Sequence, residues 1–231
     1  MISAIIPAFN EEGCIIEFAN RLETALKDLD EQFEIIFMVG GTDSTYALLV
    51  DWRKNRSNVW IIYEKERGLG TAIVKGFAYL HRMSEWVLTM DSDLQQLPEE
   101  IYKLWNRRAY SDVVIGSKGE LDSRSFFKRV ISKLLYRMYR YTHDIQVRDM
   151  GSNFRLYWRK VIKALPLKDA PPGYQFQQWS LLQIWKAGFG ILEVPTTFNP
   201  RMTGKSKLSM WHELYERFIR KLSLSGLIRE R

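Results

Sequence analysis

The stretch Trp86-Val-Leu-Thr-Met-Asp91-Ser-Asp93-Leu-Gln95 determines how the rest of the chain is interpreted. Trp86 to Met90 is a short apolar run with the length of a buried strand. Two carboxylates one residue apart follow it, then an amide, and then Pro98, which suits the start of a helix. In an open α/β sheet, ligands bind just beyond the carboxyl ends of the strands. We therefore expect Asp91 and Asp93 to lie at a ligand-binding edge.

The chemistry of this stretch favours a divalent metal. Two neighbouring carboxylates repel each other unless a cation lies between them. Carboxylate and amide oxygens suit Mg²⁺ or Mn²⁺, and Mg²⁺ usually keeps water and substrate phosphates as its other ligands. Asp91, Asp93 and Gln95 are accordingly the predicted metal ligands, beside a diphosphate. The alternative is that Asp91 or Asp93 caps the helix that follows.

Strand and helix patterns alternate along the chain with short connections. This alternation predicts an α/β fold with a mostly parallel, Rossmann-like sheet and helices on both faces. Pro195 lies inside the last predicted strand and indicates a sheet edge. The predicted strands are Ile2 to Pro7, Phe33 to Val39, Asn58 to Tyr63, Trp86 to Met90, Asp112 to Gly116 and Gly190 to Phe198; a turn and strand are expected over Arg148 to Arg155, with Asp149 and Arg155 paired.

Bulk composition indicates one large domain with an anionic partner. The chain has 231 residues, of which 46% are hydrophobic, and a formal net charge of +7. The segment from Gly116 to Lys160 holds 11 Lys/Arg against 4 Asp/Glu, so the whole excess lies there. Cys14 is the only cysteine, and the first residues do not form a signal peptide, so we expect a reducing, cytoplasmic location.

Two glycines, Gly68 and Gly70, open a helix expected to reach about His81. The pair favours a tight turn. The other interpretation is that the backbone here approaches a phosphate at the helix N-terminus.

Two basic amphipathic segments leave two interpretations open. Phe126 to Tyr141 places apolar residues on one side of a helix and Arg129, Lys133, Arg137 and Arg140 on another, and the tail from Leu208 to Leu224 repeats the pattern. Such helices either pack on the core or lie on an anionic membrane surface. Between them, the loop Asn199 to Leu208 is basic, which is compatible with a solvated loop or with one that folds over a diphosphate.

Six pieces in this order resemble the family 2 glycosyltransferases of GT-A fold, and within them the dolichyl-phosphate mannose synthase and polyprenyl-phosphate glycosyltransferase branch. The resemblance runs from Ile5 to Leu208. The pieces are Ile5-Ile-Pro7-Ala-Phe-Asn10-Glu11, Arg67-Gly68-Leu-Gly70-Thr-Ala, Met90-Asp91-Ser-Asp93-Leu-Gln95, Asp149 to Arg155 (Asp-x-x-Ser-Gly-Phe-Arg in the family), Glu193-Val-Pro195 and Arg201-Met-Thr-Gly204-Lys-Ser206-Lys207-Leu.

The resemblance implies roles for individual residues. A catalytic domain would span residues 1–208, and residues 209–231 would form an amphipathic helix and possible membrane anchor. The residues implied to bind or position the nucleotide sugar are Pro7, Ala8, Asn10, Glu11, Gly40, Asp43, Gly68, Gly70, Thr71, Asp91 and Ser92; those implied to grip the phosphates or act in catalysis are Asp93, Lys118, Arg129, Arg201 and Lys207.

The chain departs from the family pattern at two positions that bear on the site. Val39-Gly40-Gly41-Thr42 stands where the family usually has Asp-Asp-Gly-Ser, whose aspartate contacts the nucleoside, and this makes base selectivity an open question. Lys118 stands where the family has Arg, which keeps the charge but loses the bidentate fork.

The expected activity is metal-dependent, inverting transfer of a hexose, mannose from GDP-mannose in the first instance, to a dolichyl or polyprenyl phosphate at the cytoplasmic face of a membrane. The alternatives are a UDP-sugar donor or a nucleotide-binding module without transferase activity. No nucleic-acid partner is expected, because the basic segment carries no recognised motif.

Overall fold

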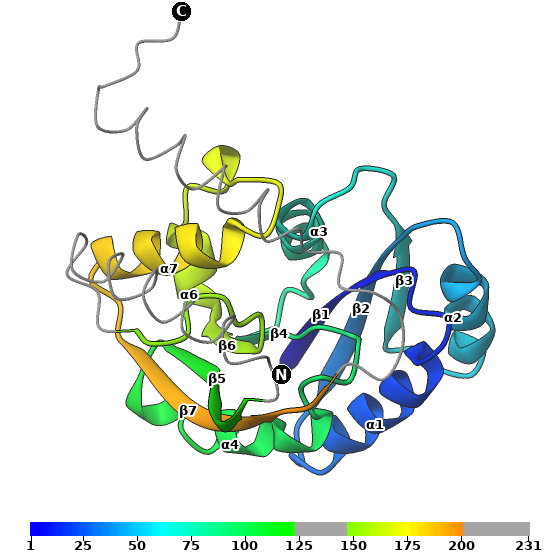
Figure 1. Ribbon diagram of the computed structural model, residues 1–231, viewed down its shortest axis with the longest axis horizontal. Helices are drawn as coiled ribbons and strands as arrows, with labels where there is room; N and C mark the ends of the chain where they lie inside the picture. The colour runs from blue at the N-terminus through cyan, green and yellow to red at the C-terminus, as the bar shows by residue number, and fades with distance from the viewer. Residues whose placement is uncertain (123–146, 201–231) are drawn as a thin grey trace, which may run out of the picture.

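A computed structural model describes residues 1–122 and 147–200 of the protein (Figure 1). Its centre is a seven-stranded sheet with the order β3-β2-β1-β4-β6-β5-β7. β6 runs antiparallel to both of its neighbours, while the other described pairings are parallel. The strands are β1 (Ile2–Phe9), β2 (Phe33–Gly40), β3 (Val59–Tyr63), β4 (Trp86–Thr89), β5 (Val113–Asp122), β6 (Arg155–Trp158) and β7 (Ile191–Phe198).

Helices cover both faces of this sheet (Figure 1). One core cluster joins the sheet to α1 (Ile15–Lys27), α2 (Thr45–Arg53) and α4 (Ile101–Trp105). The other joins the opposite face to α3 (Leu69–Gly76), α6 (Arg159–Ala164) and α7 (Phe176–Lys186). The short 3-10 helices are η1 (Phe77–Tyr79), η2 (Pro98–Glu100), η3 (Arg108–Tyr110) and η4 (Leu167–Asp169). The predicted α/β class, with helices on both faces, is confirmed.

The apolar runs explain which strands are central. β1 and β2 are buried along nearly their whole length, as expected for parallel strands covered on both faces. Ile5 of β1 belongs to one core cluster and Ile6 to the other, because successive side chains of a strand point to opposite faces. On the face to which Ile6 points, α1 buries Ile15, Phe18, Ala19, Leu22, Ala25 and Leu26, which recur at helical spacing.

Parallel pairing brings the carboxyl ends of β1, β2, β3 and β4 to one edge of the sheet. Asn10, Gly41, Glu64 and the segment around Asp91 leave these strands at that edge. The predicted ligand-binding edge is therefore built from four consecutive strand ends.

Several sequence-based expectations are refined. β7, which contains Pro195, is one of the two edge strands, as predicted. β5 runs on to Asp122, and α3 stops at Gly76 before a turn of 3-10 helix, short of the predicted end near His81. The predicted Asp149–Arg155 pair is wrong, because Arg155 is fully buried and donates to carbonyl and hydroxyl oxygens.

Three predicted elements lie outside the described residues: the basic helix over 126–141, the loop from Arg201 onward and the tail over 209–231, together with the domain boundary at 208. Within residues 1–122 and 147–200, no helix has the length and hydrophobicity needed to cross a bilayer.

Candidate active site

The turn after β4 holds the two aspartates of the opening stretch. Ser92, between them, is buried, and its hydroxyl donates to the carbonyl of Pro7 at 3.0 Å, which fastens the turn to β1. Leu94 has φ 58°, a conformation that non-glycine residues adopt uncommonly. Backbone strain of this kind persists only where the surrounding contacts hold it, as the contact with Pro7 does here.

Asp93 is 7% exposed, and its Oδ1 accepts the backbone N–H of Gln95 at 3.1 Å. The side-chain amide of Gln95 donates to the carbonyl of Asn199 at 3.2 Å, and the N–H of Asn199 donates back to the Gln95 carbonyl at 2.8 Å. This exchange ties the end of β7, two residues before Arg201, to the predicted metal motif.

The helix-cap alternative does not hold for this turn. The helical segment begins at Pro98, and Leu97 is its N-cap residue, without a side-chain hydrogen bond. The aspartates therefore lie in the turn ahead of the helix and do not cap it.

Asp91 is held from the neighbouring strand. Its Oδ1 accepts a hydrogen bond from the side-chain amide of Asn153 at 3.0 Å. Asn153 is 2% exposed, and its backbone carbonyl accepts the hydroxyl of Thr89 at 2.7 Å. The first carboxylate of the pair is thus oriented by a buried side chain just ahead of β6.

The donor set fits a magnesium or manganese ion that shares its coordination with substrate. Asp91 and Asp93 supply carboxylates, and Oε1 is the Gln95 atom that remains for a metal because Nε2 donates to Asn199. No group of three His, Cys, Asp or Glu side chains with metal-site geometry occurs in the described ranges. An ion with few protein ligands, completed by phosphate and water, is the mode expected of Mg²⁺.

A hollow of about 350 Å³ opens at the end of β2 on the same sheet edge. The rings of Tyr46 and Tyr63 meet edge to face at 5.5 Å, and the Tyr63 hydroxyl donates to the carbonyl of Gly41 at 3.3 Å. The hollow is lined by Val39, Gly40, Gly41, Thr42, Asp43, Tyr46 and Tyr63. It lies where the predicted nucleotide residues Gly40 and Asp43 stand.

Asn10, which has φ 54°, organises the loop beside this hollow. Its Oδ1 accepts the backbone N–H of Thr42 at 2.8 Å and that of Asp43 at 3.4 Å. Asp43 in turn accepts the N–H of Glu12 at 3.1 Å and of Thr45 at 3.0 Å, so its carboxylate holds the start of α2. These bonds give Asn10 and Asp43 structural roles beside their predicted binding roles.

Two further predicted binding residues on this side also make structural contacts. The backbone N–H of Glu11 donates to the hydroxyl of Thr45 at 2.8 Å. Ala8 is buried in the core at the end of β1, so a ligand would meet its backbone and not its side chain.

The glycines in this loop leave no room for side chains. A Cβ on Gly41, which has φ +108°, would lie 1.9 Å from Oδ1 of Asn10. A Cβ on Gly40 would lie 3.1 Å from the ring of Phe9 and 3.2 Å from the carbonyl of Glu64. Of these two glycines, only Gly40 stands where the family has aspartate, so close packing accompanies the departure at that position.

A charged cluster borders the same edge. Burial raises the pKa of the Glu64 carboxyl, but hydrogen bonds from the backbone amide of Glu66 and from Lys75 lower it more, so the net shift is downward. Nearby, the guanidinium of Arg67 lies 4.8 Å from the centre of the Phe9 ring. The edge thus carries a cation packed on an aromatic ring beside the loop of the hollow.

Gly68 is the N-cap residue of α3 and Gly70 lies in its first turn, and close packing explains why both are glycine. A Cβ on Gly68 would lie 2.2 Å from the carbonyl of Pro172, and one on Gly70 would lie 2.1 Å from the carbonyl of Pro171. The N–H of Thr71 donates to the Pro172 carbonyl at 3.0 Å, so this amide is not part of an open phosphate cradle. Glycine is needed here because the chain before α7 crosses closely over α3.

The predicted phosphate-gripping residues are placed only in part. Lys118 lies on β5, with its ammonium 4.4 Å from the centre of the Phe198 ring and its backbone N–H donating to Asp149 at 3.1 Å. Arg129, Arg201 and Lys207 lie outside the described residues.

Sequence reasoning missed Asn153, Tyr46 and Tyr63. Asn153 becomes visible only through the antiparallel register that pairs Thr89 with Arg155, because extending that register sets residue 153 beside residue 91. The two tyrosines are separated by a helix and a connection, and no local pattern brings them together.

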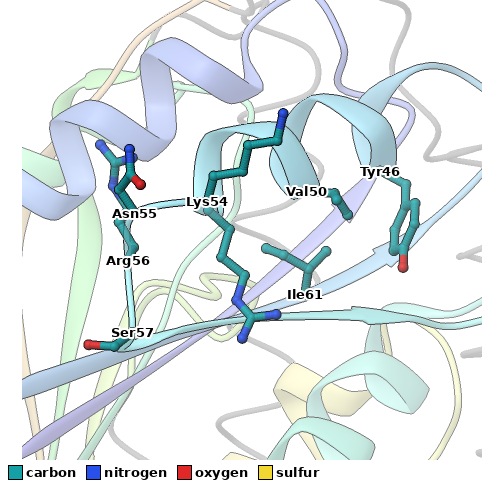
Figure 2. A pocket seen from close by; sticks show the side chains of 8 residues that line it. Tyr46, Val50, Lys54, Asn55, Arg56, Ser57 and Ile61 are labelled. Atoms are coloured by element: carbon teal, nitrogen blue, oxygen red, sulfur yellow. The ribbon is translucent and has the colours of Figure 1, made fainter.

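A separate hollow of about 660 Å³ lies between α2 and edge strand β3 (Figure 2). Tyr46, Val50 and Ile61 form its apolar side, as Figure 2 shows. Two of its cations are engaged: Arg56 with Glu23 at 3.1 Å, and Lys54 with Asp51. This second hollow lacks paired carboxylates, so the turn after β4 remains the candidate active site.

A family model described as "Glycosyl transferase family 2" matches residues 3–165. The chain belongs to this family. This glycosyltransferase has the GT-A fold, since the matched range contains the sheet edge and carboxylate turn described above.

Solved structures with the same fold include glucosyl-3-phosphoglycerate synthase from Mycobacterium tuberculosis in complex with Mn²⁺, uridine diphosphate and glucosyl-3-phosphoglycerate. That enzyme and this chain share 20% sequence identity with a TM-score of 0.70, and the match covers 100% of this chain and 81% of the synthase. Mannosyl-3-phosphoglycerate synthase from Rubrobacter xylanophilus gives 12% identity and a TM-score of 0.74, over 100% and 76% of the two chains. At these identities the likeness concerns the fold.

Proposed function

We propose that this glycosyltransferase moves a hexose from a nucleotide sugar onto the phosphate group of an acceptor, with mannose from GDP-mannose and a polyprenyl or dolichyl phosphate as the first pair to test. The observation that carries the proposal is the buried turn after β4. It presents Asp91 and Asp93 at the same sheet edge as the hollow between Tyr46 and Tyr63.

Asp91, Asp93 and Gln95 would hold Mg²⁺ or Mn²⁺. When bound, the metal neutralises the charge that develops on the leaving diphosphate. The protein's own side chains orient the site: Asn153 donates to Asp91, and the Gln95 amide donates to Asn199, at the start of the basic loop.

The acceptor supplies its own nucleophile. A phosphate monoester has a second pKa near 6 and is mostly dianionic at neutral pH. Its oxygen would attack the anomeric carbon in line as the bond to the diphosphate breaks, which inverts the configuration. No strong general base is required, so catalysis would depend on positioning and charge stabilisation.

The polyprenyl phosphate acceptor is supported by the six-piece resemblance and by the basic character of residues 116–160. The bonds between Gln95 and Asn199 support a basic loop that begins close to the metal motif, where Arg201 and Lys207 would contact phosphate. We further propose that the protein is peripheral on the cytoplasmic face of a membrane.

A small phosphorylated acid is the second candidate acceptor. It is favoured by the two solved structures above, whose names place 3-phosphoglycerate as the group that receives the sugar. Both acceptors present a negatively charged phosphate, so the basic segment is compatible with either.

The test is a radiolabelled transfer assay with Mn²⁺. Donors are GDP-mannose, UDP-glucose and UDP-N-acetylglucosamine, and acceptors are a polyprenyl phosphate and 3-phosphoglycerate. We expect lipid-extractable product with a polyprenyl phosphate. Asp93→Asn should lower turnover about 100-fold or more, because it removes a charge that faces the metal and diphosphate.

Asp51→Asn is the matched control, since Asp51 is an exposed carboxylate on α2 that pairs with Lys54. Water-soluble product would select the phosphoglycerate-type acceptor. Undiminished turnover in Asp93→Asn would remove the metal role. Product from no combination would favour a nucleotide-binding module without transferase activity.

A further inference from the structure

The antiparallel pairing of β4 with β6 places the buried side chain of Asn153 against the turn that carries Asp91 and Asp93. Thr89 pairs with Arg155, and the chain continues from Thr89 toward Asp91 and back from Arg155 to Asn153. The amide of Asn153 donates to Oδ1 of Asp91 at 3.0 Å, and its side chain is almost fully buried.

The turn that carries Asn153 is fixed on several sides. The Ser152 hydroxyl donates to the carbonyl of Gly116 at 2.7 Å, and the amide of Gln96 donates to the same hydroxyl at 3.2 Å. The backbone amides of Arg148 and Asp149 donate to the carboxylate of Glu193 at 2.9 and 2.8 Å. Asn153 therefore has little freedom to move away from Asp91.

Arg155 fixes the same turn from below. Its guanidinium donates to the carbonyls of Met150 and Ser152 at 3.1 and 2.7 Å, and to the carbonyl of Gln177 in α7 at 3.0 Å. A planar guanidinium with five N–H groups holds several carbonyls in a set geometry. Through Arg155, the packing of α7 on the sheet therefore helps to fix the position of Asn153.

We propose that Asn153 is a positioning residue that orients the Asp91 carboxylate for the metal–diphosphate group of the donor. The hydrogen bond to Oδ1 restricts rotation of the carboxylate and directs its remaining lone pairs. Groups that hydrogen-bond to metal ligands set the ligand orientation, and their loss weakens metal binding. This inference rests on the proposed function, since it needs Asp91 to bind a metal.

The test measures binding and not turnover. Free Mn²⁺ is followed by its EPR signal as protein is titrated in the presence of excess UDP or, separately, GDP. We expect Asn153→Ala to raise the dissociation constant for Mn²⁺ about tenfold or more. Asn58→Ala is the matched control, because the Asn58 amide also makes one hydrogen bond, to the carbonyl of Phe33, away from the site.

Thermal unfolding separates positioning from general destabilisation. Asn153→Ala should lower the melting temperature at least as much as Asn58→Ala, because Asn153 is buried and Asn58 only partly so, but only Asn153→Ala should weaken Mn²⁺ binding at temperatures where both variants are folded. If Asn153→Ala does not fold, Asn153→Gly carries the test. An unchanged Mn²⁺ affinity in the folded variant overturns the inference.

The variant Asp91→Ala distinguishes a failure of the Asn153 inference from a failure of the proposed function. If Asp91→Ala loses Mn²⁺ and Asn153→Ala does not, the proposed function stands and this inference falls. If the unaltered protein binds no Mn²⁺ with either nucleotide, the metal part of the proposed function and this inference fall together.

Discussion

At the scale of single residues, the site depends on side chains that hold other side chains. The carboxylates at 91 and 93 follow from the sequence, because acidic residues after a buried strand predict a ligand-binding turn. Asn153 does not, since its relation to Asp91 needs a strand pairing that spans 62 residues. The sequence favours a turn at Gly68 and Gly70, whereas in the structure the backbone of Pro171 and Pro172, about a hundred residues away, leaves no room for a side chain at either position.

Gly41 gives a prediction at this scale. Gly41→Ala should lower the free energy of unfolding by about 2 kcal/mol or more, because φ +108° is strained for alanine and the Cβ would displace the Asn10 side chain. Gly188→Ala is the matched control: it has φ +79° but nothing within 4 Å of its Cβ, so it carries only the backbone cost, about 1 kcal/mol. Urea unfolding measures both, and equal losses would show that Asn10 does not limit position 41.

At the scale of elements, most strands and helices follow from periodicity, and their ends do not. Pro195 correctly predicts the edge strand, because proline lacks the N–H that a central strand donates. The end of α3 was placed too late: the helix changes to a 3-10 turn at Phe77, although the apolar pattern continues. Apolar side chains continue beyond Gly76, but in η1 only Phe77 is buried, where it packs against Tyr157, and Tyr79 is exposed.

The contact between α1 and η2 gives a prediction that depends on pH. Arg21 binds both oxygens of Glu99, at 2.7 and 2.9 Å, and these hydrogen bonds lower the pKa of the Glu99 carboxyl. A lowered folded-state pKa stabilises the protein above the ordinary pKa of glutamate, and the contribution is lost as pH falls through the lowered value. The side chain of Glu99 is 52% exposed, so the contribution is about 0.5 kcal/mol.

Glu99→Gln should therefore unfold more easily than the unaltered protein at pH 7, and the difference should disappear toward pH 3. Chemical unfolding at a series of pH values, with and without 1 M NaCl, measures it, and the salt should reduce the difference. Glu85→Gln serves as the control, since Glu85 is exposed and makes no ion pair within the described part of the chain. A difference that grows at low pH would contradict the assignment.

Arg155 joins three elements, and its replacement is predicted to be costly. Its five hydrogen bonds reach the turn before β6, Tyr157 of β6 itself, and both Gln177 and Ser180 of α7. Lysine has three donors and no fork, so Arg155→Lys loses at least two of these five hydrogen bonds, at about 1–3 kcal/mol for each buried carbonyl that is left unpaired. Arg159→Lys is the control, because the three bonds of Arg159 come from one nitrogen at a partly exposed site. Similar urea midpoints for the two variants would contradict this.

At the scale of the whole molecule, the two halves of the sheet differ in strand direction and in the segments that follow their strands. The β3-β2-β1-β4 half is parallel and ends at the edge proposed to bind the nucleotide, whereas the β6-β5-β7 half contains the antiparallel strand and leads into the basic loop. Composition predicted one domain and an anionic partner, but it does not distinguish a membrane from a soluble phosphate, because both present the same charge.

A prediction about membranes follows from the charge of the chain. The full-length protein should co-sediment with vesicles that contain anionic lipid and not with neutral vesicles, and 0.5 M salt should release it. Removal of residues 209–231 should reduce binding if the tail is an anchor, with the vesicle-free sedimentation of each form as the control. Equal binding to neutral and anionic vesicles would argue against an electrostatic contact.

The packing around Gly40 also bears on how this site can change over evolutionary time. Position 40 is one of the two at which the family has aspartate, and a Cβ there would lie 3.1 Å from the ring of Phe9 and 3.2 Å from the carbonyl of Glu64. A substitution that restores an acid at position 40 would therefore have to shift Phe9 or the end of β3 before it gained any contact with a base. We expect donor preference in descendants of this protein to change through Tyr46 and Tyr63, which line the hollow, sooner than through a restored carboxylate.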